Sequence, residues 1–382
     1  RLASASEGIA TMQRGGSSAD AWVLTDVEKG ETVDRTTLLR PNHTPASLTQ
    51  RKRMVTSRAA ENLFWLGRYT ERTENSIRLA RLTLNSLNGE DPSSPPLLAW
   101  LSEMALKNTL VLPGVPTASQ ARRVFERSLI ASLGGSEGAT SVGYQLRALK
   151  LTASSVRERL SQEHWSVIMR AESEFTRRCA AHAAQGDWSA VSALRVLDTA
   201  SGHMAAITGA QTDRMTRDDG WRLLSIGRLI ERLCVLIPAL ASGFETGAVH
   251  DTGGFEAMVA LFDSTITFHA QYQQSREVTA LLDLLVLDRD NPRSLGWVVQ
   301  TVRGRLAKLA GSAADDLDPL ARRLPDPGEW ELGTLCTPDS QGRYPALAQL
   351  LEQCQRAAWQ LSDDISLKYF THTGETGQSL GA

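Results

Sequence analysis

The chain has 382 residues, of which 42% are hydrophobic and 22% are charged, and its formal net charge is −2. This length allows one large domain or two to three ordinary ones, and the hydrophobic fraction is sufficient for a buried core. The near-neutral charge gives no overall electrostatic reason to expect binding to nucleic acid or to an anionic membrane surface.

The four cysteines stand far apart and form no C-x-x-C pair, which is typical of buried thiols in a reducing compartment. No apolar run reaches the roughly 18 residues that a membrane-spanning helix needs, and the sequence shows no signal-peptide pattern. We therefore expect a cytoplasmic protein. The sequence starts at Arg1 without a methionine, which indicates a piece of a longer polypeptide.

Residues 1–50 differ in composition from the rest of the chain. The stretch from Gly15 to Ser18 predicts a glycine-rich turn, and Asp20–Leu24 predicts a short strand after it. Residues 25–50 are polar, contain two prolines and are typical of a linker. Their apolar content is too small for a core, so we expect residues 1–50 not to form an independent domain.

From Thr56 onward, apolar residues recur at three- and four-residue steps, which predicts helices almost throughout. The first helix should end at Asn88-Gly89, and the others are expected near 97–108, 117–133, 138–160, 161–185, 187–209, 216–243, 253–273, 275–288, 291–313, 316–323 and 343–370. The stretch 324–345 predicts an irregular loop, and residues 373–382 predict a mobile tail. With no strand pattern after residue 50, the fold class should be all-α, with a large helical bundle at residues 51–372.

Local signals predict how the helix near residues 216–243 begins and ends. Thr216 and Asp219 have the spacing of a capping box at its start. Pro238 should kink or end the same helix, because proline lacks an N–H and its ring clashes with the preceding turn.

The string Gly-Arg-x-x-Glu-Arg occurs twice, as Gly67–Arg72 and Gly227–Arg232. On a helix, the arginines and the glutamate of one copy project from one side. A glycine in a helix interior costs about 1 kcal/mol relative to alanine, which indicates close approach of another backbone. Two copies indicate an internal duplication, and we expect the two helices to pack together through Gly67 and Gly227.

A stripe of arginine and glutamate suits an anionic ligand, because guanidinium groups bind carboxylate and phosphate bidentately. The candidate ligand-binding residues in and before the two strings are Arg58, Glu61, Asn62, Arg68, Glu71, Arg72, Arg217, Asp218, Arg228, Glu231 and Arg232. We expect the four motif arginine heads to converge, with Glu71 and Glu231 as orienting partners. Their excess positive charge then needs Glu61, Glu74, Asp218 or a bound anion. The alternative is a polar network that only cross-links the helices.

Asn291 and Pro292 predict a helix start, with Asn291 as the cap and Pro292 in the first turn. Arg293 would then lie beside free backbone N–H groups, which is unfavourable for a cation unless it faces an anion or a buried carboxylate. Asn291 and Arg293 are therefore also candidate ligand-binding residues.

Metal chemistry and the common catalytic motifs find no support in the sequence. None of the seven histidines has a glutamate or aspartate three residues before it, as a di-iron carboxylate bundle requires. No H-E-x-x-H, Walker A or G-x-S-x-G string occurs. We therefore assign no metal site, no cofactor and no catalytic residue to the chain.

Four segments together resemble the bacterial alpha-E domain family: Ser57–Glu74, Met215–Arg232, Asn291–Ser294 and Lys368–His372. They occur in the family's order over roughly residues 54–372. The family is all-helical and is typically encoded beside, or fused to, a circularly permuted ATP-grasp protein, often with a transglutaminase-like protease. This resemblance implies a role in ATP-dependent formation of amide or peptide bonds.

Gln13–Leu24 resembles the closing segment of such a permuted ATP-grasp domain, except that Ala19 stands where that family commonly has lysine. Because only this end of the domain is present, the resemblance implies ATP and Mg²⁺ only together with a complete ATP-grasp domain. The implied partners are an ATP-grasp ligase domain, fused or separate, and an amino-acid or peptide-like substrate.

Three interpretations follow. The leading one is a helical substrate-binding or partner module of an ATP-grasp amide ligase system, which needs unpaired arginine heads lining a pocket. The second is an enzyme that uses Glu61, Glu71 or Glu231 as general acid or base, which needs a carboxylate with a strongly raised pKa. The third is a structural scaffold, in which every charge is paired and no cavity is present.

Overall fold

The computed structural model describes residues 2–3, 17–18, 55–89, 93–135, 141–186, 188–273, 275–311 and 319–370. The chain forms two compact units, Arg1–Lys52 and Arg53–Ala382. In the first unit, β1 (Leu2–Ala3) pairs antiparallel with β2 (Ser17–Ser18). The strand predicted at residues 20–24 and the tail predicted at residues 373–382 lie outside the described residues.

The described residues of the second unit form helices joined by turns and loops, and they contain no strand. Its helices are α2 (Ser57–Asn88), α3 (Pro95–Lys107), α4 (Ala118–Leu133), α5 (Val142–Ser154), α6 (Gln162–Gln185), α7 (Ala190–Asp213), α8 (Asp219–Glu245), α9 (Thr252–Leu261), α10 (Thr265–Tyr272), α11 (Val278–Leu282), α12 (Leu295–Ala310), α13 (Leu332–Leu335) and α14 (Pro345–Tyr369). A π-helical segment (Asp283–Leu287) follows α11, and short 3-10 helices occupy Arg157–Arg159, Ala248–His250, Ala321–Arg323 and Pro327–Glu329. The all-α fold class is therefore confirmed.

The longest helix, α2, begins and ends where its sequence predicts. The hydroxyl of Thr56 caps it by accepting a hydrogen bond from the backbone N–H of Ala59 at 3.2 Å. Gly89 follows its last turn. Apolar residues, including Leu63, Leu66, Ile77 and Leu84, are buried along its length.

The start and the course of α8 differ from the prediction. Asp218, not Thr216, is its cap, and the Asp218 carboxylate accepts from the backbone N–H of Trp221 at 3.0 Å. Pro238 does not end the helix, which continues to Glu245. The residues on both sides of the proline, Ile237 and Ala239, are buried. Their tertiary packing stabilises the helix by more than the single proline destabilises it.

The segment predicted as one helix over 253–273 is divided into α9 and α10. Asp263 lies between them with a φ of 50°, in the left-handed region that breaks an α-helix. Ser264 follows it and its backbone N–H donates to the carbonyl of Val259. The periodicity of the side chains does not report this single change of backbone angle.

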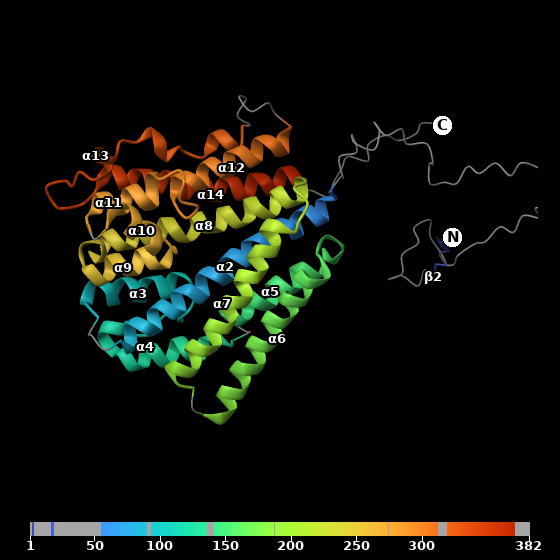
Figure 1. Ribbon diagram of the computed structural model, residues 1–382, viewed down its shortest axis with the longest axis horizontal. Helices are drawn as coiled ribbons and strands as arrows, with labels where there is room; N and C mark the ends of the chain where they lie inside the picture. Colours follow the sequence, from blue (N-terminus) through green and yellow to red (C-terminus); the bar gives the residue numbers. More distant parts are fainter. Residues whose placement is uncertain are drawn as a thin grey trace, which may run out of the picture. The chain divides into compact units, whose positions relative to one another are not determined.

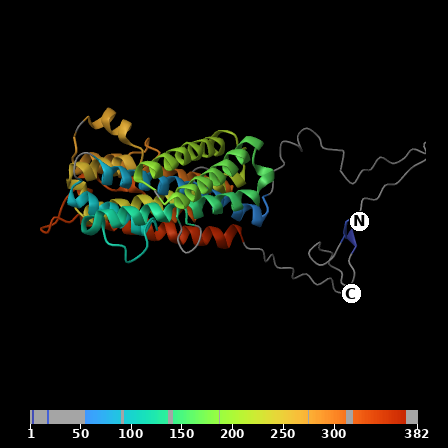
Figure 2. The same ribbon diagram turned by 90° about the horizontal axis from the view of Figure 1, so that it is seen from below.

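Helices α2 and α8 form the centre of the bundle and lie side by side (Figure 1). The hairpin of α6 and α7, together with α5, packs on the α2 side, and α12 and α14 pack on the α8 side. The indole N–H of Trp100 in α3 donates to the carbonyl of Ala239 in α8 at 3.0 Å, which fixes α3 against the same centre. Helices α6 and α7 run steeply across α8 and α14 in Figure 1, and the view from below shows the same helices foreshortened (Figure 2). In the described part of the chain, none of the helices is long and apolar enough to cross a membrane.

Candidate functional site

Gly67 of α2 and Gly227 of α8 bring the two motif helices into backbone contact. A Cβ atom on Gly67 would lie 1.9 Å from the carbonyl oxygen of Leu224, and one on Gly227 would lie 2.2 Å from that of Phe64. No side chain fits at these distances, so only glycine permits the approach. The prediction that the helices pack through these two glycines is confirmed.

The two motif helices run in the same direction. Leu63 of α2 lies against Gly220 of α8, and further along both helices Glu71 lies against Arg232. Because the contacts advance together, α2 and α8 are parallel and the two strings face each other in register. The ion pairs across this seam join residues between 154 and 163 positions apart in the sequence.

Glu231 of the second string is bound by both arginines of the first. Arg68 donates from Nε to Oε2 of Glu231 at 2.8 Å, and Arg72 donates from Nε to Oε1 at 2.7 Å and from its terminal nitrogen to Oε2 at 2.9 Å. The other end of Arg68 donates to the hydroxyl of Ser362 in α14 at 2.8 Å. This group of contacts therefore joins α2, α8 and α14.

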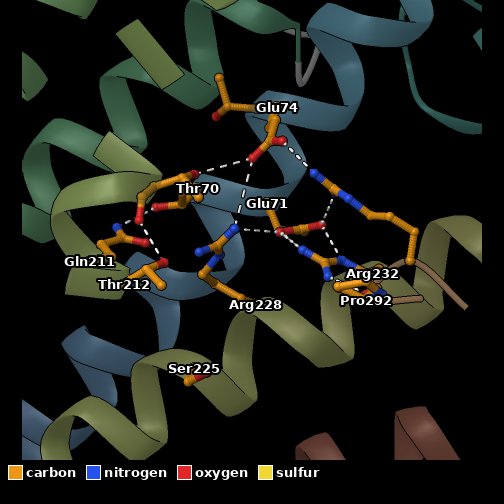
Figure 3. Close-up of polar contacts among 12 residues, drawn as sticks. Thr70, Glu71, Glu74, Gln211, Thr212, Ser225, Arg228, Arg232 and Pro292 are labelled. Carbon is orange, nitrogen blue, oxygen red and sulfur yellow. Dashed lines mark hydrogen bonds and ion pairs between the residues drawn. The ribbon is translucent and has the colours of Figure 1, made fainter. Parts of the chain in front are cut away.

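Glu71 of the first string is fully buried and is bound by both arginines of the second (Figure 3). Arg232 donates to its two carboxylate oxygens at 2.7 and 2.9 Å, and Arg228 donates to Oε2 at 3.1 Å. Arg232 also donates to the carbonyl of Pro292 at 2.8 Å. Each string thus supplies the carboxylate that neutralises the arginines of the other.

Arg293 joins the Glu71 group from the loop before α12. It donates to Oε1 of Glu71 at 3.3 Å and to Oε1 of Glu74 at 3.0 Å. Glu74 also forms an ion pair with Arg228 at 3.8 Å and with Arg78 at 3.0 Å. Glu74 is therefore one of the acids that offset the excess of arginine, as expected.

The expectation that the four motif arginine heads converge on one point is wrong. Arg68 and Arg72 gather around Glu231, whereas Arg228 and Arg232 gather around Glu71. Among the described residues, no hydrogen bond or ion pair joins the two groups. The physical reason is that a buried guanidinium is stabilised by a carboxylate and destabilised by another guanidinium, so each arginine reaches across the seam to the opposite glutamate.

The surroundings of Glu71 keep it ionised. Burial raises its pKa, but the charges of Arg232, Arg228 and Arg293 and the hydrogen bonds from Arg232 more than offset that effect and hold the pKa well below its usual range. A carboxylate that stays ionised at neutral pH is a poor general acid, and one with so low a pKa is a weak base. Glu71 therefore does not meet the requirement of the enzyme interpretation.

This depressed pKa predicts how stability depends on pH. Ionised Glu71 contributes fully to the free energy of unfolding at a pH above its unfolded-state pKa, near 4.5. This contribution is lost as the pH falls from there towards the pKa of Glu71 in the folded state. We expect the free energy of unfolding to fall below about pH 4.5 more steeply in the native chain than in Glu71→Gln. Urea unfolding of both chains at a series of pH values measures the two slopes, and parallel slopes would contradict the assignment.

Three candidate residues, Arg58, Glu61 and Asn62, precede the first string on α2. Arg58 is exposed at the start of α2, and its carbonyl accepts from the side-chain amide of Asn62 at 2.8 Å. Glu61 is half-buried, and among the described residues the carboxylate that binds both Arg68 and Arg72 is that of Glu231. The role of Glu61 in ligand binding stays a prediction.

Arg217 and Asp218 also lie apart from the glutamates of the two strings. Asp218 caps α8 and forms an ion pair with Arg159 at 2.6 Å, so it does not neutralise the motif arginines. Arg217 is exposed, and its guanidinium carbon lies 4.0 Å from the ring centre of Trp221. Their roles in ligand binding stay predictions.

The predicted helix start at Asn291 is wrong, because α12 begins at Leu295 with Ser294 as its cap. Asn291 is buried instead in the turn before the helix. Its side-chain oxygen accepts from the backbone N–H of Arg293 at 3.0 Å, and its amide donates to the carbonyl of Leu284 at 3.0 Å. These bonds hold the loop so that Arg293 faces a buried carboxylate. Such a carboxylate is one of the two partners that the sequence analysis required for a cation at this position.

Three polar residues near these groups were not predicted: Ser362, Ser225 and Arg305. Ser362 binds Arg68, and Arg305 of α12 donates a hydrogen bond to the hydroxyl of Ser225 in α8. None of them belongs to a repeated string. Helical spacing is the sequence pattern that could have identified Ser225, because Ser225 lies one turn from Trp221 and from Arg228 on the same face of α8.

The cysteines do not form a reactive centre. All four are free thiols; Cys179 and Cys354 are buried, and Cys234 and Cys336 are half-buried. Burial raises the pKa of Cys179 and of Cys354 to about 12, which is the behaviour of an unreactive thiol. Within the described ranges, no group of three or more His, Cys, Asp or Glu side chains is placed to hold a metal ion.

A groove of about 1230 Å³ runs between α8 and α14. We call it the α8–α14 groove. Its lining includes Ile237, Pro238, Ala241 and Phe244 of α8, Leu347, Ala348, Leu351, Gln355 and Trp359 of α14, and Asn108, Gln341 and Tyr344 from adjoining loops. Cys234, one turn beyond Glu231 on α8, lies at one end of it. The groove is therefore built on the same helix as the second string.

Comparison with known proteins gives a family and relatives. The Alpha-E family, described as a predicted alpha-helical domain with a conserved ER motif, matches residues 55–370. Two uncharacterized proteins, Rv2567 of Mycobacterium tuberculosis and Mb2597 of Mycobacterium bovis, are each 26% identical to the chain over 315 residues. The match covers 77% of this chain and 34% of each relative, so the chain spans about a third of the length of the curated relatives it matches. No solved structure matches the chain.

The family description agrees with the centre of the fold. Two Glu-Arg dipeptides, Glu71-Arg72 and Glu231-Arg232, lie at the seam between α2 and α8. The arginine of each forms an ion pair with the glutamate of the other. The helical unit coincides with the matched range, and the match covers most of the chain. The chain belongs to the Alpha-E family.

Proposed function

We propose that this Alpha-E domain is a binding module of an ATP-grasp amide or peptide ligase system, and that the α8–α14 groove holds a peptide-like substrate. The observation that carries the proposal is the groove itself. Its volume of about 1230 Å³ exceeds the roughly 300–1,000 Å³ typical of small-molecule pockets. That size favours an extended peptide over a single amino acid.

The lining of the groove suits a peptide chain. Apolar side chains such as Phe244 and Trp359, which are not buried, offer surface for apolar side chains of the substrate. Asn108, Gln341 and Gln355 contribute amide groups that both donate and accept hydrogen bonds, as a peptide backbone requires. The charged residues in the lining carry both signs, so the surface selects no strongly acidic or basic ligand.

In this proposal the paired Gly-Arg-x-x-Glu-Arg helices are the rigid frame of the module. Their arginines form ion pairs with Glu71 and Glu231 across the seam, which agrees with the scaffold interpretation for the strings themselves. The frame positions α8, and α8 forms one wall of the groove. Scaffold and binding module are therefore two parts of one domain.

The connection to an ATP-grasp ligase rests on two supports. Gln13–Leu24 resembles the closing segment of a permuted ATP-grasp domain. About two thirds of each curated relative lies outside the match, which leaves room for further domains there. In the proposed system the ligase domain supplies ATP and Mg²⁺ binding, and the reaction takes place in the cytoplasm.

Filling the groove tests the proposal. Ala348 lines the groove and is exposed, so Ala348→Trp should occupy it without disturbing the core. With the complete ATP-grasp ligase that accompanies the domain, we expect the rate of ATP-dependent peptide-product formation to fall about tenfold or more. Product is followed by mass spectrometry and ADP release by a coupled assay, with amino acids and short peptides as acceptors.

Gln349→Trp is the matched control, because Gln349 is exposed on the next position of α14 and does not line the groove. It should leave the rate unchanged, and both variants should keep the melting temperature of the native chain. Equal rates for the native chain and Ala348→Trp, or an unaltered rate when the Alpha-E domain is removed from the ligase, would overturn the proposal.

A further inference from the structure

Arg305 of α12 is a partly buried arginine without an acidic partner. Its hydrogen bond goes to the hydroxyl of Ser225, and among the described residues no carboxylate lies within ion-pair distance of it. Arg303, two positions earlier on the same helix, has the usual arrangement and pairs with Asp326 at 2.9 Å. Within the described part of the chain, Arg305 therefore differs from its near neighbour Arg303 in having no counter-charge.

The charged side chains that influence Arg305 are all arginines. Burial lowers its pKa, and the charges of Arg228, Arg217 and Arg232 lower it further, to about 10. Arg217 and Arg305 both lie against the ring of Trp221, with guanidinium carbons 4.0 and 4.9 Å from its centre. The aromatic ring attracts both cations but carries no net charge to neutralise them.

Arg228 adds an unused donor to the same region. Its terminal nitrogen binds Glu71, but its Nε is buried and has no hydrogen-bond partner. A buried N–H without a partner is uncommon and indicates a missing acceptor. Ser225, one turn before Arg228, lies on α8 outside the ion-pair network around Glu71 (Figure 3).

We propose that Arg305, Arg228 and Ser225, with Arg217 and Trp221 at the edge, form a binding site for an oxyanion, the carboxylate or phosphate group of a ligand. Guanidinium groups bind both kinds of oxyanion through paired N–H donors, and a hydroxyl adds a further donor. A bound oxyanion supplies the negative charge that the protein itself does not provide here.

The oxyanion site is independent of the α8–α14 groove. None of its residues lines the groove, whose contribution from α8 begins at Cys234. Failure of one proposal therefore leaves the other standing. The two sites use different parts of α8: residues 221–228 contribute to the oxyanion site, and residues 234–245 line the groove.

The test is binding of inorganic phosphate, and separately of acetate, to the full chain at constant ionic strength, with chloride as the reference. We expect one of the two anions to raise the melting temperature in a saturable way and to bind measurably by calorimetry. Saturation by phosphate alone identifies a phosphate group, and saturation by acetate identifies a carboxylate. No difference from chloride for either anion overturns the proposal.

Variants of Arg305 locate the effect. Arg305→Met should weaken binding at least about tenfold, and in the absence of the anion it should melt no lower than the native chain because it removes an uncompensated charge. Arg305→Lys keeps the charge but loses the paired donors, so it should bind with intermediate affinity. Arg276→Met is the control, since Arg276 pairs with Glu256 on the surface, and it should bind as the native chain does.

Two outcomes would count against the site. Native affinity in Arg305→Met would show an adventitious ion only, bound elsewhere. A clear loss of stability in anion-free Arg305→Met, with Ser225→Ala still binding normally, would show that Arg305 serves packing and not a ligand.

Discussion

Gly67→Ala is expected to destabilise the domain by about 3 kcal/mol, although alanine favours helices. The added methyl group would lie 1.9 Å from the carbonyl oxygen of Leu224, which belongs to the backbone of α8 and cannot move away as a flexible side chain can. The two helices must separate, and the ion pairs across the seam must lengthen with them. Gly227→Ala should behave in the same way, because its methyl group would lie 2.2 Å from the carbonyl oxygen of Phe64. Urea unfolding measures both effects.

Matched controls for these variants exist in the same bundle. Gly209 of α7 and Gly304 of α12 are helical glycines with open space where a Cβ would stand. Gly209→Ala and Gly304→Ala should each stabilise the domain by about 0.5–1 kcal/mol, because they gain helix propensity without a clash. If Gly67→Ala stabilised the domain as these controls do, the close contact between α2 and α8 would be wrong.

Glu71→Gln is expected to cost about 3–5 kcal/mol, since removal of one partner leaves buried charges uncompensated. The side chain of Glu71 has no solvent exposure, and it accepts hydrogen bonds from Arg228, Arg232 and Arg293. A glutamine offers one acceptor oxygen and no charge to these three cations. Thermal and urea unfolding should both report the loss.

A control variant and a rescue variant show whether the lost charge of Glu71, and not a change in packing, causes the loss of stability. Glu352→Gln removes the acid of an exposed pair with Arg356 on α14 and should change stability by less than about 1 kcal/mol. Adding Arg232→Met to Glu71→Gln removes one of the stranded cations, so the double variant should be more stable than Glu71→Gln alone. An additive or larger loss in the double variant would mean that Arg232 stabilises the fold by its packing and not through Glu71.

The helices and their glycine contact could be predicted from the sequence because both leave a repeated local signal. Periodic burial of leucine and isoleucine gives α2 its face, and an unfavourable glycine at the same place in two strings indicates a backbone neighbour. Arg293 was predictable for a related reason, as a cation placed where only an anion or a carboxylate makes it acceptable. In each case the signal is carried by the residue and its immediate neighbours.

The pairing of charges could not be predicted in the same way. Four arginines and two glutamates are compatible with one converged site or with two crossed groups, and only the parallel packing of α2 and α8 decides between them. Arg305 and Ser225 come from helices distant in the chain, so their contact has no local pattern. The φ of 50° at Asp263 is likewise a single backbone angle set by packing, which hydrophobic periodicity does not record.

The crossed ion pairs have a consequence for how the chain can be divided. A fragment that holds only one string has two arginines and a glutamate whose partners belong to the other string. Two complete chains that exchanged α8 would restore every one of these pairs, with each α2 bound to the α8 of the other molecule. The contacts that lock one monomer are therefore also those that a domain-swapped dimer would make.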